Sequence, residues 1–200
     1  MKAPLGNIGI PHAPACRVSR RSLLRAAGAL LFAPGLVRAQ ACRPTPRDAL
    51  GPFYKPNAPA QAELCKSASD GTHKLIVSGR VLGMPQCTPL AGAFVEVWQA
   101  DERGDYSQVG ARPDNPGCLL RASLRTDGEG RYRYSTILPG EYPGRPRHIH
   151  YRVSHAGYAT LVTQLYFDRR RGIPDALVAS IVTEAGGAAR ASFDITLAAA

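Results

Sequence analysis

The chain has 200 residues, 44% of them hydrophobic, and a formal net charge of +10. Its length and composition suit one globular domain. Six basic residues and no acidic residue lie within residues 1–41, so the rest of the chain carries only about +4. The positive charge is concentrated in a segment that processing can remove, and it does not indicate a nucleic-acid-binding protein.

Residues 1–41 have the features of an export signal. SRRSLLR (19–25) precedes the apolar run AAGALLFAPGLV (26–37), and small-residue cleavage patterns end at Ala39 or Ala41. Paired arginines before a modest apolar stretch resemble a twin-arginine signal. A run of about 12 residues is too short to span a membrane, which takes about 20. We predict a cleaved signal, a periplasmic or secreted protein, and no stable membrane anchor. The alternatives are an ordinary signal, an uncleaved anchor, or a lipoprotein acylated at Cys42.

The cysteines agree with export. Cys16 lies in the signal, which leaves Cys42, Cys65, Cys87 and Cys118. An even number of cysteines outside the cytoplasm predicts two disulfides, for which three pairings are possible. The sequence does not choose among them; our expectation is Cys42–Cys65 and Cys87–Cys118. A four-cysteine zinc site is disfavoured because it needs closely spaced pairs.

The chain after the signal divides into an arm and a β-rich domain. Residues 42–73 are rich in proline and polar residues and predict an extended arm, which includes the stretch GPFY (51–54). Residues 74–200 hold short apolar or alternating runs between turn signals, typical of an all-β sandwich of about seven or more strands. The predicted strands are LIVSGRVL (75–82), AFVEVWQA (93–100), LLRASLRT (119–126), RYRYSTI (131–137), HIHYRV (148–153), TLVTQLYF (160–167) and ASFDITL (191–197). One short C-terminal helix is predicted from Pro174 to about Glu184, because proline favours a helix start.

Two histidines stand one residue apart in a predicted strand. Residues i and i+2 of a strand project from the same face, so His148 and His150 point together and Ile149 points away. Two neutral imidazoles on one face can bind one metal ion. The pattern by itself is more often an unliganded polar strand, and it also fits a zinc or copper site on the two histidines.

Two tyrosines narrow the choice of metal. Tyr142 follows a Pro-Gly turn shortly before the histidines, and Tyr106 follows the strand that contains Trp98. A phenol has a pKa near 10 and is a poor ligand while protonated. Only a strongly Lewis-acidic ion such as ferric iron holds it as phenolate. The plainer interpretation of Tyr142 is a turn tyrosine that packs on the end of the sandwich.

The complete set of motifs is specific. In chain order these are W-Q-A-D-x-x-G-x-Y, R-T-D-x-x-G-x-Y, P-G-x-Y-P, R-P-x-H-I-H and T-Q-L-Y-F, preceded by GPFY. Together they resemble the intradiol ring-cleaving dioxygenases, the non-haem ferric enzymes that include catechol 1,2-dioxygenase and protocatechuate 3,4-dioxygenase. The resemblance runs from about Gly51 to Phe167 and covers most of the chain after the signal.

This resemblance implies a ferric ion bound by Tyr106, Tyr142, His148 and His150 on a β-sandwich. It implies that the enzyme uses O2 to cleave a catechol-type ring between its two hydroxyl-bearing carbons, giving a cis,cis-muconate-type product. By family position Tyr142 is the ligand that leaves the metal and takes a substrate proton, while Tyr106 stays bound.

Two further residues match catalytic positions of the family. Arg145 matches an arginine that stabilises developing negative charge, and Gln164 matches a glutamine that assists by hydrogen bonding. Their plainer interpretations are a solvated surface charge and a strand side chain bonded to the backbone. Trp98 and Asp101 also match, with structural roles as the expectation, and Asp127 is expected to form a turn with Gly128.

The sequence also departs from the family. Only five residues separate Tyr142 from His148, which predicts a different or more open wall of the site. Arg147 stands where a small residue is common; it can favour an anionic catechol or face solvent. No helical N-terminal dimerisation region is present, and a homo-oligomer is an open alternative. The competing functions are a non-catalytic β-sandwich binding module and a zinc or copper site on His148 and His150.

Overall fold

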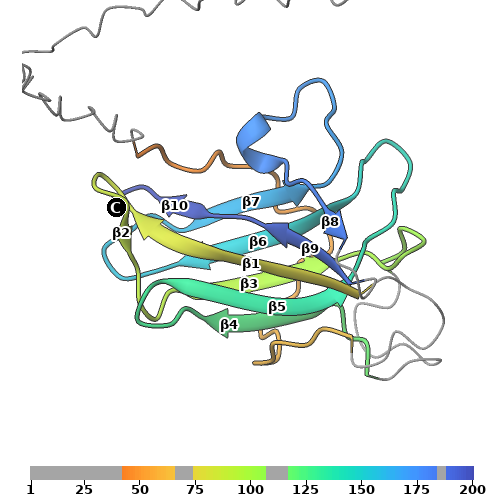
Figure 1. Ribbon diagram of the computed structural model, residues 1–200, viewed down its shortest axis with the longest axis horizontal. Coiled ribbons are helices and arrows are strands. Elements are labelled where there is room, and N and C mark those ends of the chain that lie inside the picture. Colours follow the sequence, from red (N-terminus) through yellow and green to blue (C-terminus); the bar gives the residue numbers. More distant parts are fainter. Residues whose placement is uncertain (1–41, 66–73, 107–116, 184–187) are drawn as a thin grey trace, which may run out of the picture. The chain divides into compact units, whose positions relative to one another are not determined.

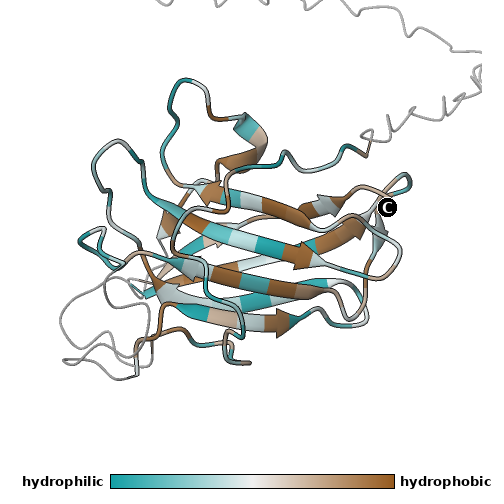
Figure 2. Cartoon of the chain, turned by 180° about the vertical axis from the view of Figure 1, so that it is seen from behind, coloured by the Kyte–Doolittle hydropathy of each residue, from teal (hydrophilic) through white to brown (hydrophobic). Residues whose placement is uncertain are grey.

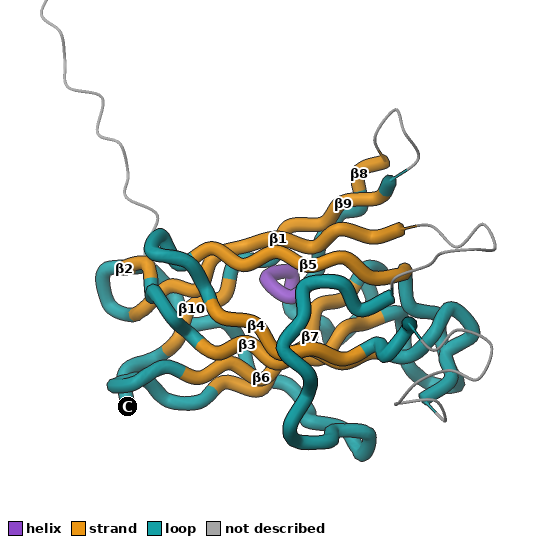
Figure 3. The backbone as a smooth tube through the Cα atoms, turned by 90° about the horizontal axis from the view of Figure 1, so that it is seen from below, coloured by secondary structure: helices purple, strands orange, loops and turns teal. Residues whose placement is uncertain are grey.

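The computed structural model describes residues 42–65, 74–106, 117–183 and 188–200. The predicted export signal lies outside these residues. The described part forms two β-sheets packed face to face, as Figure 3 shows from below. Residues 40–200 belong to one compact unit. The predicted all-β sandwich is therefore confirmed.

The six-stranded sheet is built around one long strand, β1. On one side β1 pairs antiparallel with β5, and on the other it pairs parallel with β9 and then β10 (Figure 1). β2 pairs with the end of β1, and β8 pairs with β9. The strands are β1 (Lys74–Gly83), β2 (Thr88–Pro89), β5 (Arg131–Ile137), β8 (Val182–Thr183), β9 (Ala189–Ser192) and β10 (Ile195–Leu197).

The four-stranded sheet is antiparallel throughout, in the order β4-β3-β6-β7. Its strands are β3 (Phe94–Gln99), β4 (Arg121–Arg125), β6 (His148–Ser154) and β7 (Leu161–Tyr166). Alternate residues face the other sheet, so Val95 and Val97 of β3 and Ile149 and Tyr151 of β6 join the core. Figure 2 shows the resulting alternation of hydrophobic and hydrophilic residues along the strands. The residues between them face outward, and this outer face carries His148 and His150.

The arm, residues 42–65, starts beside β10 and ends beside β5, and its middle part at Gly51 lies over that outer face. It touches the sheets through isolated bridges rather than as a strand, for example Ala60 with Ser123. Its backbone also bonds to β7, where Asp48 N donates to the carbonyl of Val162 at 2.9 Å. The arm thereby brings residues far from the histidines in sequence onto the face that carries them.

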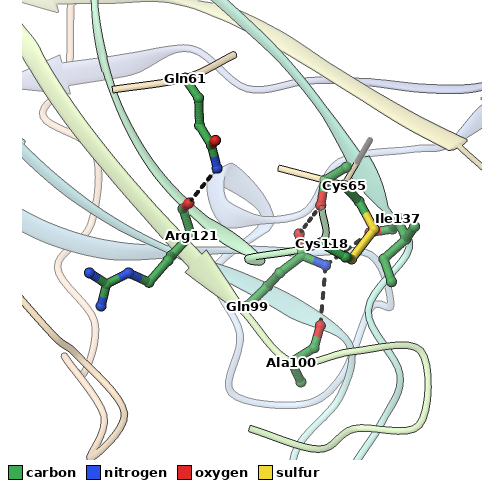
Figure 4. Close-up of a disulfide and its surroundings, with 8 residues drawn as sticks. Gln61, Cys65, Gln99, Ala100, Cys118, Arg121 and Ile137 are labelled. Carbon is green, nitrogen blue, oxygen red and sulfur yellow. Dashed lines mark hydrogen bonds between the residues drawn. A yellow bond between two sulfur atoms is a disulfide. The ribbon is translucent and has the colours of Figure 1, made fainter. Parts of the chain in front are cut away.

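The expected disulfide pairing is wrong. The structure joins Cys42 to Cys87 and Cys65 to Cys118. The cause is non-local backbone pairing: the end of the arm forms an antiparallel bridge at Cys65 and Cys118, which places these two side chains together. Figure 4 shows this disulfide beside Gln99, whose amide nitrogen donates to two backbone carbonyls. Both ends of the arm are thus covalently fixed to the sandwich.

The helix predicted from Pro174 to about Glu184 is also wrong. A single 3-10 turn, η1 (Asp175–Leu177), is followed at once by extended backbone at Val178. Ala179 N donates to the carbonyl of Tyr166 at 2.9 Å, so this segment pairs with the end of β7 instead of continuing a helix (Figure 1). Residues 184–187 lie outside the described part. In the ranges that are described, no helix has the length and apolar character needed to cross a membrane.

Candidate metal centre

Strand β6 presents two histidines to the same side. His148 and His150 are each only 2% exposed, and their Nε2 atoms lie 3.2 Å apart. His148 Nδ1 lies 2.7 Å from the carbonyl oxygen of Pro146. A carbonyl can only accept, so Nδ1 carries the proton, and the lone pair of His148 Nε2 faces the space shared with His150. The predicted shared face of the two histidines is therefore present.

His150 is held by the neighbouring strand. Its ring stacks on Trp98 of β3, with centroids 4.9 Å apart and planes 2° from parallel. Trp98 has the structural role expected for it, but against His150 on the outer face and not in the main core. The stack leaves His150 few orientations, which preorganises it as a ligand.

Burial keeps both imidazoles neutral. It lowers the pKa of His150 to about 3, with further lowering from the nearby His148 and Arg145. It also lowers the pKa of His148, and the hydrogen bond to Pro146 opposes this only in part. Neutral imidazole is the form that binds metal ions, so both side chains are ready to bind near neutral pH.

Tyr106 comes from a loop built around Asp101. Asp101 Oδ1 accepts hydrogen bonds from the backbone nitrogens of Arg103 and Asp105, each at 2.9 Å. This closes the tight turn that delivers Tyr106, which is 6% exposed and whose ring lies edge-on to that of Tyr142 at 5.8 Å. The structural role expected for Asp101 is thus explained.

Two glycines let the Tyr106 and Tyr142 loops press together. A methyl group at Gly104 would lie 2.3 Å from the carbonyl oxygen of Glu141, and one at Gly140 would lie 2.4 Å from that of Glu102. Gly140 N also donates to Asp101 O at 2.7 Å. The glycines that recur in the W-Q-A-D-x-x-G-x-Y and P-G-x-Y motifs are required by this close approach.

Tyr142 stands at the edge of the centre. A tight turn joins it to Arg145 through two backbone hydrogen bonds, and its hydroxyl oxygen lies 3.5 Å from His148 Nε2. Tyr142 is half-buried, whereas Tyr106 is buried. The two tyrosines thus differ in how freely their hydroxyl groups can move.

Burial disfavours ionisation of both tyrosine hydroxyls. Burial raises the pKa of Tyr106 well above its usual value, Tyr142 adds to the effect, and Arg145 and the backbone of Ala100 oppose it. Burial likewise raises the pKa of Tyr142, against the lowering effect of Arg145. Within the described residues the Tyr106 hydroxyl is buried without a hydrogen bond, a costly state for a polar group. A multivalent cation would reverse this by stabilising phenolate.

These donors suit one strongly Lewis-acidic ion. His148 Nε2 lies 3.2 Å from His150 Nε2 and 3.5 Å from the Tyr142 oxygen. The ring centroid of Tyr106 lies 5.8 Å from that of Tyr142 and 6.3 Å from that of His150. Across the described residues no three His, Cys, Asp or Glu side chains are grouped to hold a metal. The tyrosines are therefore what makes a four-donor set here.

Arg145 and Gln164 also meet at this centre. Gln164 of β7 lies opposite His150 of β6 and is fully buried. Its Oε1 accepts from Arg145 Nη2 at 2.5 Å, and its Nε2 donates to the carbonyl of Ala49 at 2.7 Å. Arg145 is thereby held beside Tyr142, and its Nε is buried without a partner among the described residues. The solvated-surface interpretation of Arg145 does not hold.

The arm contributes contacts to which the sequence assigned no role. Phe53 stacks on Tyr106 with ring centroids 4.2 Å apart, and Tyr54 packs on Trp98 at 5.0 Å. Gly51 lies directly against His150. The GPFY motif was the available signal, but nothing local shows that it reaches the metal-binding face.

Arg147 and Asp127, which the sequence analysis also considered, have partners outside the donor set. Arg147 forms an ion pair with Asp168 at 3.9 Å, and its side chain is 41% exposed. Asp127 Oδ1 accepts from the nitrogens of Glu129 and Arg131, as expected for a turn.

A buried His/Tyr donor set on a β-sandwich defines a class of non-haem metal protein. A sequence model of the family described as "Dioxygenase" matches residues 49–198. This match covers most of the chain and all the donors above. The chain belongs to the intradiol dioxygenase family.

Individual relatives agree. Catechol 1,2-dioxygenase of Candida albicans is 38% identical over an alignment of 138 positions, and the match covers 58% of this chain and 45% of the relative. The structure of the dioxygenase domain of a dioxygenase carbohydrate-binding protein fusion from Streptomyces sp. SirexAA-E is 35% identical, with a TM-score of 0.65, and covers 79% of this chain and 100% of that one. Catechol 1,2-dioxygenase of Acinetobacter radioresistens gives a TM-score of 0.68 at 28% identity, covering 81% and 65%. The chain spans about half the length of the first curated relatives it matches.

Proposed function

We propose that this protein is a non-haem iron(III) intradiol dioxygenase, which uses O2 to cleave a catechol-type ring between its two hydroxyl-bearing carbons to a cis,cis-muconate-type product. The observation that carries the proposal is the convergence of Tyr106, Tyr142, His148 and His150 on one buried face. The Streptomyces dioxygenase domain, matched over its whole length, supports the idea that a chain of this size contains what the reaction needs.

When held by these four residues, ferric iron would supply a Lewis acid that makes the catechol hydroxyls more acidic and activates the ring toward O2. The chain's part is to hold the donors and to manage protons. Tyr142 is half-buried on a tight turn, so its phenolate oxygen can swing away and accept a proton from a substrate hydroxyl. Tyr106 is buried and stacked on Phe53, so it stays in place.

Arg145 supplies positive charge to the same space. Its guanidinium is fixed through Nη2 by Gln164, and its buried Nε has no protein partner in the described part. A preorganised donor in a dry site stabilises negative charge that develops on the substrate during reaction. Gln164 contributes by orienting the arginine.

The substrate class is a catechol. The relatives are named for catechol, chlorocatechol, hydroxyquinol and protocatechuate. The pairing of Arg147 with Asp168 weighs against Arg147 as a free charge that selects an anionic catechol. A neutral catechol is therefore the first substrate to try.

We also propose that the protein is exported by the twin-arginine route and works in the periplasm or outside the cell. The two disulfides support this, because such bonds persist in oxidising compartments. The route also suits a protein that folds around its metal before export. Replacing Arg20 and Arg21 by lysine should leave the protein in the cytoplasm, whereas export of that variant would contradict the proposal.

One experiment tests the activity. The mature protein is purified, its iron is measured, and its visible spectrum and oxygen uptake are recorded with and without catechol. We expect about one iron per chain, a tyrosinate-to-iron absorption band that shifts on adding catechol, and stoichiometric oxygen uptake. An iron-free, colourless protein that stays inactive after reconstitution would contradict the proposal. Zinc or copper bound without colour from tyrosinate would favour a site on His148 and His150 alone.

A further inference from the structure

Asp48 belongs to the arm, far from the metal-binding strands in sequence, yet it reaches their outer face. Its own nitrogen donates to the Val162 carbonyl at 2.9 Å, and the hydroxyl of Thr163 donates to the Pro46 carbonyl at 2.8 Å. These bonds fix the arm on β7 on both sides of position 47. The carboxylate of Asp48 is therefore part of a defined structure and not of a loose tail.

Both carboxylate oxygens of Asp48 have partners. Oδ1 accepts from the nitrogen of Ala49 at 2.6 Å, and Oδ2 accepts from the hydroxyl of Tyr166 at 2.9 Å. The carbonyl of the same Ala49 accepts from Gln164 Nε2 at 2.7 Å. The dipeptide Asp48–Ala49 thus holds two neighbouring side chains of β7.

Tyr166 has one hydroxyl proton and two acceptors near it. Gln164 Oε1 lies 2.8 Å from the hydroxyl oxygen, and Asp48 Oδ2 lies 2.9 Å from it. The amide nitrogen of Gln164 donates to the carbonyl of Ala49. The amide atom that faces Tyr166 is therefore the oxygen, which can only accept a hydrogen bond. A hydrogen bond to a carboxylate is roughly twice as strong as one between neutral groups, so the Tyr166 hydroxyl donates to Asp48 and not to Gln164.

The direction in which the Tyr166 hydroxyl donates decides which acceptor atoms are available to Arg145. With Tyr166 donating to Asp48, the tyrosine oxygen and Gln164 Oε1 both present lone pairs. Arg145 Nη2 has two N–H groups and lies 2.5 Å from Gln164 Oε1 and 3.3 Å from the Tyr166 oxygen. Without Asp48, Tyr166 would donate to Gln164 and compete with Arg145 for the same oxygen.

We propose that Asp48 is a positioning residue for Arg145, acting through the hydroxyl group of Tyr166; the role depends on the function proposed above for Arg145. Asp48 does not touch the substrate. It sets the donor direction of Tyr166, so that the guanidinium is held by two acceptors on one edge and the buried Nε remains for the reaction.

The test uses the mature full-length chain with Asp48→Asn, Asp48→Ala, Tyr166→Phe and the double variant Asp48→Ala/Tyr166→Phe. The control is Asp175→Asn, which removes an exposed carboxylate paired with Arg169 away from the centre. Each variant is characterised by crystal structure, by kcat and KM, and by the visible tyrosinate band. Thermal unfolding shows which variants are folded.

In the Asp48 variants we expect Arg145 Nη2 to move out of hydrogen-bonding range of Gln164 Oε1. We expect kcat to fall about tenfold with little change in KM, and the visible band to be unchanged. The double variant should be no slower than the slower single variant, because the two residues act in series. Asp175→Asn should behave as the unmodified protein.

A guanidinium that stays in place in folded Asp48→Asn and Asp48→Ala would overturn the proposal, as would additive effects of Asp48→Ala and Tyr166→Phe on kcat. The crystallographic result does not depend on turnover. If the unmodified protein had no dioxygenase activity, the proposed function would be wrong. The position of Arg145 in the crystal structures of the variants would still decide the role of Asp48.

Discussion

Gly51 lies directly against His150. A methyl group at Gly51 would lie 3.0 Å from His150 Cε1, and Gly51 has a φ of +75°. The arm backbone therefore closes over the imidazole so tightly that an added methyl group would require His150 to shift. A residue in the segment predicted to lack regular structure is thereby in van der Waals contact with a metal-donor side chain.

Gly51→Ala should lower both stability and iron content. The left-handed backbone costs about 1 kcal/mol for alanine, and the new methyl group pushes His150 from its stack on Trp98. Gly157→Ala is the matched control, because Gly157 has a φ of +80° and open space around it. Both variants should show the backbone cost in denaturant unfolding, whereas only Gly51→Ala should lose iron. Equal iron content in the two variants would contradict the contact.

The alternation in HIHYRV predicted β6 and the shared face of His148 and His150, because one side of this strand packs in a core.

ASFDITL was predicted as one strand but forms two. β1 has no side chain at Gly79, and the backbone of Phe193 crosses over it: a methyl group there would lie 1.9 Å from Phe193 O. Such a crossing depends on a partner strand far away in sequence, so the local pattern cannot show it.

The donor set was predictable only through resemblance to a family. The spacing of His148 and His150 in one strand is enough to relate these two residues. Tyr106 comes from a separate loop, and glycines allow this loop to pack closely against the loop of Tyr142. The disulfide pairing and the contacts of Asp48 could not be predicted from the sequence for the same reason. They depend on where the arm crosses the sandwich, which is set by non-local hydrogen bonds.

Tyr106→Phe should weaken and shift the visible absorption band, because only Tyr142 is left as a tyrosinate donor, and should remove most of the activity. The phenyl ring keeps the stack on Phe53 but cannot bind a metal ion. Iron affinity should fall by at least about tenfold. Tyr158→Phe is the control, since Tyr158 packs on the core at Gly83, away from the centre. Absorbance and iron content of the two purified proteins check this, and a Tyr106→Phe protein with unchanged band and unchanged iron content would remove Tyr106 from the donor set.

Arg145→Ala should keep the iron and its colour while kcat falls about 100-fold, the usual loss when a preorganised donor is removed from a reacting charge. Arg147→Ala removes a positive charge two residues away but disrupts only the half-exposed pair with Asp168, and should change kcat less than about twofold. Steady-state kinetics with catechol, at matched iron content, distinguishes the two. Normal turnover by Arg145→Ala would show that the assigned role is wrong.

The stability of the metal-free protein should fall as pH decreases from about 6.5 toward 3. Burial lowers the pKa of His150 from 6.5 to about 3 in the folded state, so between these values the unfolded chain binds a proton that the folded chain does not. One such proton lowers the free energy of unfolding by up to about 1.4 kcal/mol per pH unit, and the lowered pKa of His148 acts in the same direction.

Denaturant unfolding at a series of pH values measures the slope of the free energy of unfolding against pH. His150→Gln should reduce it. An unchanged slope in His150→Gln would mean that His150 is not held neutral by the fold, and that binding of a metal ion near neutral pH would have to compete with a proton there.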